Sequence, residues 1–108
     1  MIVKRTLLFL KAASFDAFAE AYYQTGIVLV SLTVNNGYLH GVLSDTAPEG
    51  VSESKLVAVN QSSDDPTQAL NAALIEGENN GHDLDLINIV YFNDLIIYHF
   101  NIMPISSN

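Results

Sequence analysis

The sequence predicts an α+β fold in which two βαββ units form a mainly antiparallel sheet with two helices packed on one face. Three observations lead to this prediction. Extended apolar runs and amphipathic helical stretches follow each other in the same order twice. A two-residue turn signal divides the extended part of each half. The 108 residues, 49% of them hydrophobic, suffice for one modest core. We therefore expect a single domain, 1–108, with pseudo-repeat halves at about 1–45 and 54–103.

The first half begins with an extended apolar run at 6–12 and continues as a helix from Phe15 to Tyr23. Ser14 is a good N-cap, because its hydroxyl can accept hydrogen bonds from the free amides of the first turn. Gly26 is expected to end this helix in a left-handed conformation.

A hairpin follows, with strands at 27–35 and 38–44 joined by Asn36-Gly37. This dipeptide suits a type I′ turn, because both central residues need positive φ. Such a turn places Val34 opposite Leu39 and, further along, Val30 opposite Leu43. Side chains alternate across a strand, so the hairpin has one apolar and one polar face. The predicted apolar face consists of Val30, Leu32, Val34, Leu39 and Leu43.

The second half repeats this order with an extended segment at 55–60 and a helix from Asp65-Pro66 to about Gly77. Asp65 is suited to cap the helix, and the fixed φ of Pro66 suits its first position. The segment 76–83 is rich in polar and turn-forming residues and is expected to be a loop.

The last hairpin, 86–100, is expected to turn at Asn93-Asp94, which makes both of its faces largely apolar. One face would hold Ile87, Ile89, Tyr91, Ile96, Tyr98 and Phe100. The other would hold Leu86, Val90, Phe92, Leu95 and Ile97, with Asn88, His99 and Asn101 as its polar members. Because two short helices offer little cover for a second face, we expect a homodimer or other homo-oligomer. Its predicted interface is Val90, Phe92, Leu95 and Ile97. The alternative is cover by the chain's own loops and N-terminal segment.

The formal net charge is −8, and no lysine or arginine follows Lys55, whereas seven acidic residues do. Direct binding to nucleic acid is not expected, because it relies on clustered basic side chains. The acidity can serve solubility alone, or it can form a surface for a basic protein partner.

No apolar stretch is long enough to span a membrane, and the run after Lys4-Arg5 is too short for a signal peptide. The chain has no cysteine, which excludes disulfides and thiolate chemistry. The sequence thus predicts a cytoplasmic protein.

Candidate catalytic or ligand-binding residues are few, and no motif with a defined spacing joins them. His40 and His99 are predicted on the outward faces of their hairpins, where they could share a patch if the hairpins adjoin. Tyr23 could line a pocket beside the first helix. Surface histidines and a half-buried structural tyrosine are the simpler interpretation. We expect no cofactor and no metal site, and His82 between carboxylates is more typical of a solvated loop.

Three hypotheses for the function follow. The sequence favours a small acidic, self-associating protein-interaction module without catalytic activity. The alternative is a small-ligand-binding protein or enzyme with a pocket between sheet and helices or at a subunit boundary. A third, narrower hypothesis is a nucleic-acid mimic that blocks a basic groove. A concave pocket with convergent polar groups would favour the second hypothesis, and a flat acidic face would favour the first.

Overall fold

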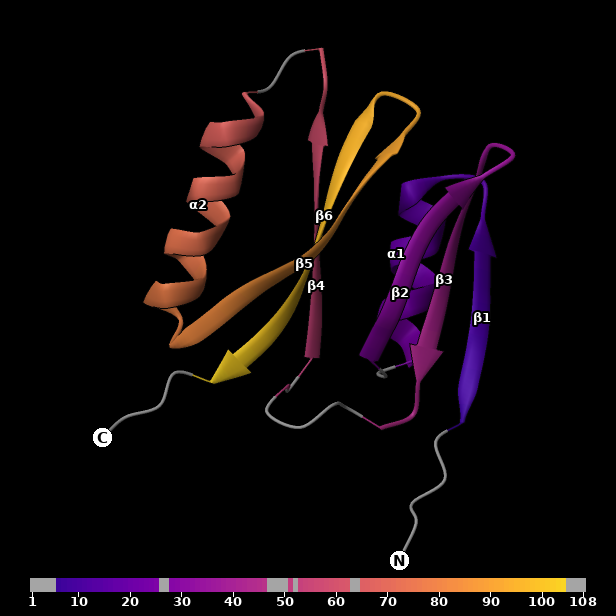
Figure 1. Ribbon diagram of the computed structural model, residues 1–108, viewed down its shortest axis with the longest axis horizontal. Helices are drawn as coiled ribbons and strands as arrows, with labels where there is room; N and C mark the ends of the chain where they lie inside the picture. The colour runs from indigo at the N-terminus through magenta and orange to yellow at the C-terminus, as the bar shows by residue number, and fades with distance from the viewer. Residues whose placement is uncertain (1–5, 26–27, 47–50, 52, 63–64, 105–108) are drawn as a thin grey trace, which may run out of the picture.

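The computed structural model describes residues 6–25, 28–46, 51, 53–62 and 65–104, and its strands and helices confirm the predicted α+β class. Two βαββ units follow each other along the chain (Figure 1). The first consists of β1 (Leu7–Ala12), α1 (Phe15–Thr25), β2 (Val28–Asn35) and β3 (Tyr38–Ser44). The second consists of β4 (Glu53–Asn60), α2 (Pro66–Asn79), β5 (His82–Phe92) and β6 (Leu95–Pro104).

The six strands divide into two antiparallel sheets of three strands each, where the sequence had suggested one sheet. Sheet A has the strand order β1-β3-β2, and sheet B has the order β4-β6-β5, so the last strand of each unit is the central one. The reason for the division is burial. Sheet B is apolar on both faces, and α2 covers one of them. The first unit covers the other because its strands pack against that face; strands added to the edge of sheet B would have left the face open.

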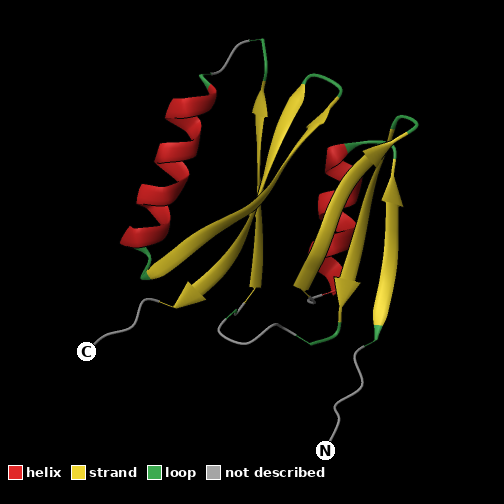
Figure 2. Cartoon of the chain, in the orientation of Figure 1, coloured by secondary structure: helices red, strands yellow, loops and turns green. Residues whose placement is uncertain are grey.

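Sheet B therefore lies in the middle of the molecule. Figure 2 shows α2 along one side of it, whereas α1 lies with the strands of sheet A on the other side. Two hydrophobic clusters correspond to these two sides. The cluster between the two units contains Phe18, Tyr22, Leu29, Leu32, Leu39, Leu43, Leu56, Phe92 and Ile97. The cluster under α2 contains Val59, Ala73, Leu84, Ile96, Tyr98, Phe100 and Ile102.

The first hairpin has the predicted turn, with φ of 53° at Asn36 and 80° at Gly37. Val34 pairs with Leu39 as expected. Further along, however, Leu29 and not Val30 pairs with Leu43, because the register shifts between Leu29 and Ser31. A β-bulge inserts one residue and so exchanges the two faces beyond it. Leu29 is consequently buried, and Val30 is partly exposed.

A second bulge changes the last hairpin in the same way. Tyr91 pairs with Ile96 and Ile89 with Tyr98, as predicted, but Phe100 pairs with Leu86 and not with Ile87. The bulge moves Leu86 to the α2 side, where it packs against the second cluster.

The expected loop at 76–83 is much shorter in the structure. α2 continues to Asn79, and β5 already begins at His82, which pairs with Pro104. The long ladder with β6 supplies the hydrogen bonds that turn this polar segment into a strand. Gly26, the predicted end of α1, lies outside the described residues.

Candidate functional site

The first unit meets sheet B along a seam in which the edge strand β2 lies across the inner face of sheet B. The seam holds polar contacts among its apolar side chains. The Leu29 amide donates to the Ser54 hydroxyl over 3.1 Å, and that hydroxyl also lies 3.3 Å from the Leu29 carbonyl. The Asn88 amide group donates to the Leu32 carbonyl over 2.6 Å. Ser54 comes from β4 and Asn88 from β5.

These contacts explain why polar residues interrupt an apolar face. An edge strand presents N–H and C=O groups that its own sheet does not pair, and leaving them buried without partners costs free energy. Ser54 and Asn88 supply partners for β2 at the place where it is buried. Their polar character is therefore accounted for by the docking of the two units.

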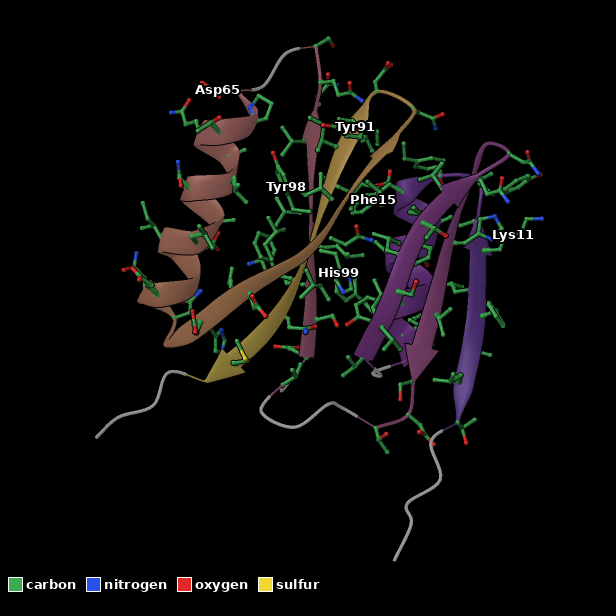
Figure 3. The ribbon with its side chains drawn as sticks, viewed as in Figure 1. Lys11, Phe15, Asp65, Tyr91, Tyr98 and His99 are labelled. Carbon is green, nitrogen blue, oxygen red and sulfur yellow. The ribbon has the colours of Figure 1, made fainter. Side chains whose placement is uncertain are left out.

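His99 lies in the same seam and is fully buried (Figure 3). Neither ring nitrogen makes a hydrogen bond to another described residue, although the imidazole lies beside the backbone of Leu29. Burial lowers the pKa of His99 to about 4, and the backbone of Leu29 acts in the opposite direction. No charged side chain is among the groups that shift this pKa. His99 is therefore neutral near pH 7.

The two histidines proposed to share a patch do not do so. His99 belongs to the interior of sheet B, so its prediction on an outward face was wrong. His40 is partly exposed on the outer face of sheet A, opposite Lys11 on β1 and Thr33 on β2. Because the core lies between these two positions, they cannot act on one ligand.

Tyr23, the third predicted ligand residue, is 61% exposed on α1. Its ring is tilted against that of Tyr22, with centroids 5.2 Å apart. Tyr22 is the buried member of the pair, and its hydroxyl donates to the Ser54 carbonyl. Burial raises the pKa of Tyr22, and the contacts with Ser54 partly offset this effect. Tyr22 thus has a structural role at the seam, whereas Tyr23 lies on open surface.

A depression of about 310 Å³ runs along the first turns of α2 and is lined by Asp65, Gln68, Ala69 and Ala72. None of the predicted ligand residues lies there. The only carboxylate in its lining, that of Asp65, already accepts the amides of Thr67 and Gln68 at 3.0 and 3.2 Å as the N-cap of α2. The depression therefore lacks the free, convergent polar groups of a small-molecule site.

The predicted interface residues are covered within one chain. Phe92 and Ile97 are 2% and 0% exposed, and Val90 and Leu95 are partly buried against the same cluster. The premise of a face left bare was wrong, because the first unit covers it. The alternative, cover by the chain's own loops and N-terminal segment, was correct only in that the cover comes from the same chain, because the covering residues belong to α1, β2 and β3. Oligomerisation itself stays a prediction, and it would need another surface.

On β5, Ile87, Ile89 and Tyr91 of the last hairpin are 42%, 43% and 65% exposed. Two further open surfaces were not singled out from the sequence. The first is β1, on which Leu7, Leu8 and Phe9 are 55%, 49% and 81% exposed. The run was recognised as a strand, but its place at a sheet edge depends on the strand order. The second is the corner where α2 ends and β5 begins. Its four exposed carboxylates, termed the acidic corner, are Glu76, Glu78, Asp83 and Asp85.

Within the described residues, no three histidine, cysteine or carboxylate side chains come together as a metal site would require. Neither of the described helices combines the length and the apolar character needed to cross a bilayer. No protein-family model, curated protein or solved structure matches the chain. Inferences about function therefore rest on the open surfaces above.

Proposed function

We propose that this protein is a non-enzymatic protein-interaction module whose acidic second half binds a basic protein partner. The observation that carries the proposal is the uneven division of charge. Residues 53–108 hold eight of the twelve acidic residues and one of the four basic ones. A charge that served solubility alone would have no need to gather in one half.

The position of two of these carboxylates supports the proposal. Glu76 and Glu78 lie in the last turn of α2, which has no basic residue. The C-terminal end of a helix carries partial negative charge, so acidic side chains there lower the stability of the helix. Asp83 and Asp85 follow at the start of β5 and add to the same negative region. An arrangement that costs stability is expected where it serves binding.

The small-ligand alternative has less support. Among its three candidate residues, His99 is buried in the seam, His40 lies on β3 and Tyr23 on α1, and none of them lines the depression described beside α2. We expect the protein to act through its surface and not through an enclosed site.

The proposal can be tested by affinity capture from an extract of the source cells. The native chain is compared with a Glu78→Lys/Asp83→Lys variant and with a control variant, Asp16→Lys/Glu20→Lys. Both variants change the net charge equally, but the control carries its changes on α1 in the first half. We expect a basic protein to bind the native chain and the control, to be lost with the acidic-corner variant, and to elute as salt is raised.

Equal loss with both variants would instead indicate non-specific attraction to net charge and would contradict the proposal. Retention by the acidic-corner variant would contradict it as well. Circular dichroism of both variants establishes that each is folded before the comparison is made.

A further inference from the structure

The strand β5 forms an outer edge of sheet B. It pairs with β6 on one side, and on the other side no strand of the described chain pairs with it. Figure 1 shows β5 running from the end of α2 to the tip of the last hairpin. Its side chains Ile87, Ile89 and Tyr91 are partly to largely exposed. An unpaired strand edge beside exposed apolar side chains is a template for a further strand.

The exposed side chains of β5 point to both faces of sheet B. Ile89 pairs with Tyr98 of the cluster under α2 and so lies on the α2 side. Asp85 pairs with Asn101, the neighbour of Phe100 in that cluster, and so lies on the opposite side. The bulge in β5 causes this exchange of faces. A helix packed on one face would contact only one of the two sets, whereas an extended segment along the edge contacts both.

Carboxylates flank the apolar part of this edge. Asp83 and Asp85 precede it on β5, Asp94 follows it in the turn, and all three are exposed. No lysine or arginine follows Lys55 in the chain. Opposite charges on neighbouring strands attract, and like charges repel. A segment that is apolar in its middle and basic at both ends therefore complements β5.

The other three strand edges suit such a segment less well. β4 carries Lys55, and none of the large apolar side chains that the structure describes on it is exposed. β2 is held against sheet B by hydrogen bonds at Leu29 and Leu32. β1 is apolar, but it contains Lys11, and Lys4-Arg5 come shortly before it in the sequence. Repulsion between like charges disfavours a basic segment there.

A second copy of this chain is a poorer occupant of the β5 edge than a basic protein. Each copy has a formal net charge of −8, so two copies repel each other. The strand of a second copy that would fit is β1, because basic residues flank its apolar run. Pairing of β1 with β5 joins two different surfaces, which adds copies one after another instead of closing a dimer.

We propose that the basic partner binds through an extended segment that pairs with the free edge of β5 and adds a fourth strand to sheet B. The segment is apolar in its middle, where it lies beside Ile89 and Tyr91. It is basic at both ends, where it meets the flanking carboxylates. The new ladder forms along residues 88–92, beyond the bulge. This inference rests on the proposed function and adds the conformation and the chemical character of the partner's segment.

A fluorescent peptide tests the pairing by anisotropy. The probe has ten residues, the length of β6, with valines in its middle and lysines at both ends. We expect saturable binding to the native chain that weakens as salt is raised. A peptide of the same composition in scrambled order should bind about tenfold more weakly. Equal binding of the two peptides would overturn the inference, and so would no binding of the probe.

Methylation of the peptide backbone separates strand pairing from attraction between charges. The N–H groups of a strand point alternately to its two sides. Methyl groups on one alternate set of the middle residues remove the donors that face β5, and methyl groups on the other set leave those donors intact. We expect one of these two peptides to lose binding and the other to keep it. Both retain their lysines, so equal binding or equal loss would overturn the strand pairing.

A variant of the chain tests the apolar part of the edge. Tyr91→Ser should weaken binding of the probe about tenfold, because it removes a 65% exposed ring without a change of charge. The matched control is Tyr23→Ser on α1, which removes a 61% exposed ring and should bind the probe as the native chain does. Equal affinities of Tyr91→Ser and the native chain would contradict the inference.

The two proposals fail separately. A basic protein from the extract that is lost with Glu78→Lys/Asp83→Lys but retained by Tyr91→Ser supports the proposed function and overturns the strand pairing. Binding of the probe as described, with no basic protein captured, supports the β5 edge and overturns the proposed function. If the native chain alone forms polymers that Phe9→Lys dissolves, the edge belongs to β1 of another copy, and the inference is wrong.

Discussion

Single residues set the turns and join the two units of this fold. Asn36 and Gly37 both have positive φ and fix the register of β2 and β3 next to the turn. Ser54 and Asn88 bind the backbone of β2, and His99 lies beside them without a hydrogen bond from either ring nitrogen to a described residue. Their contributions can be measured one at a time.

Gly37→Ala should lower the free energy of unfolding by about 1 kcal/mol, because alanine is strained at positive φ. A Cβ at Gly37 would have no atom within 4 Å, so the cost comes from the backbone alone. Gly37→Asn is the matched control and should cost less, because asparagine tolerates this region better. Urea unfolding measures both values. An unchanged midpoint for Gly37→Ala would contradict the turn assignment.

His99 should make the stability of the protein depend on pH below neutrality. Its pKa is about 4 in the folded chain against 6.5 for an unperturbed histidine. Above both values the imidazole is neutral in either state and has no effect. As the pH falls from 6.5 to 4, the unfolded chain binds the proton first, so stability is lost, by at most about 3 kcal/mol.

His99→Gln removes this titration and leaves the carboxylates unchanged. Urea unfolding at pH 7 and pH 5 should therefore show a smaller loss for the variant than for the native chain. Equal losses would mean that folding does not lower the pKa of His99.

At the scale of elements, sequence patterns located the strands and helices well, and bulges determined which side chains they bury. One inserted residue exchanges Leu29 with Val30 in β2, and another brings Leu86 to the α2 side of β5. A bulge carries no clear sequence signal here, because neither site contains a glycine or proline. The faces near each turn were therefore predicted correctly and those beyond the bulges were not.

The end of α2 provides a test at this scale. Glu78→Lys replaces an acidic side chain in the last turn by a basic one. We expect the helix to gain about 0.3–1 kcal/mol, because positive charge is favourable at a helix C-terminus. Glu20→Lys, which lies inside α1, is the control with the same change of charge. Thermal unfolding at low salt measures both, and a lower melting temperature for Glu78→Lys would contradict the dipole argument.

At the scale of the whole molecule, sheet B is covered by α2 on one face and by the first unit on the other. The cluster between the units contains residues from both, among them Phe18 and Leu32 from the first and Ile97 from the second. If the two units separated, the side chains of this cluster would lose their burial on both sides. The single domain stays a prediction, and this shared core makes it testable.

We therefore expect the chain to unfold in one cooperative transition. Leu32→Ala and Ile97→Ala remove buried side chains from opposite sides of the seam, and each should cost about 2–5 kcal/mol. In calorimetry both should lower the midpoint of the same single peak, with equal calorimetric and van't Hoff enthalpies. If Leu32→Ala produced a second, earlier transition, the two units would be separate folding units.

The sequence by itself determined the α+β class, the order of the elements, the turn at Asn36-Gly37 and the two-sided apolar character of the last hairpin. These features depend on local chemistry: side-chain periodicity, helix capping and turn residues. Only the tertiary structure decided what covers the second face of that hairpin. A pattern of apolar residues indicates that a face of the hairpin is buried, but it does not indicate which surface covers that face. Cover by a second subunit and cover by the first unit are therefore equally compatible with it. For the same reason the exposed edge at Phe9 and the buried position of His99 became apparent only once the strand order was known.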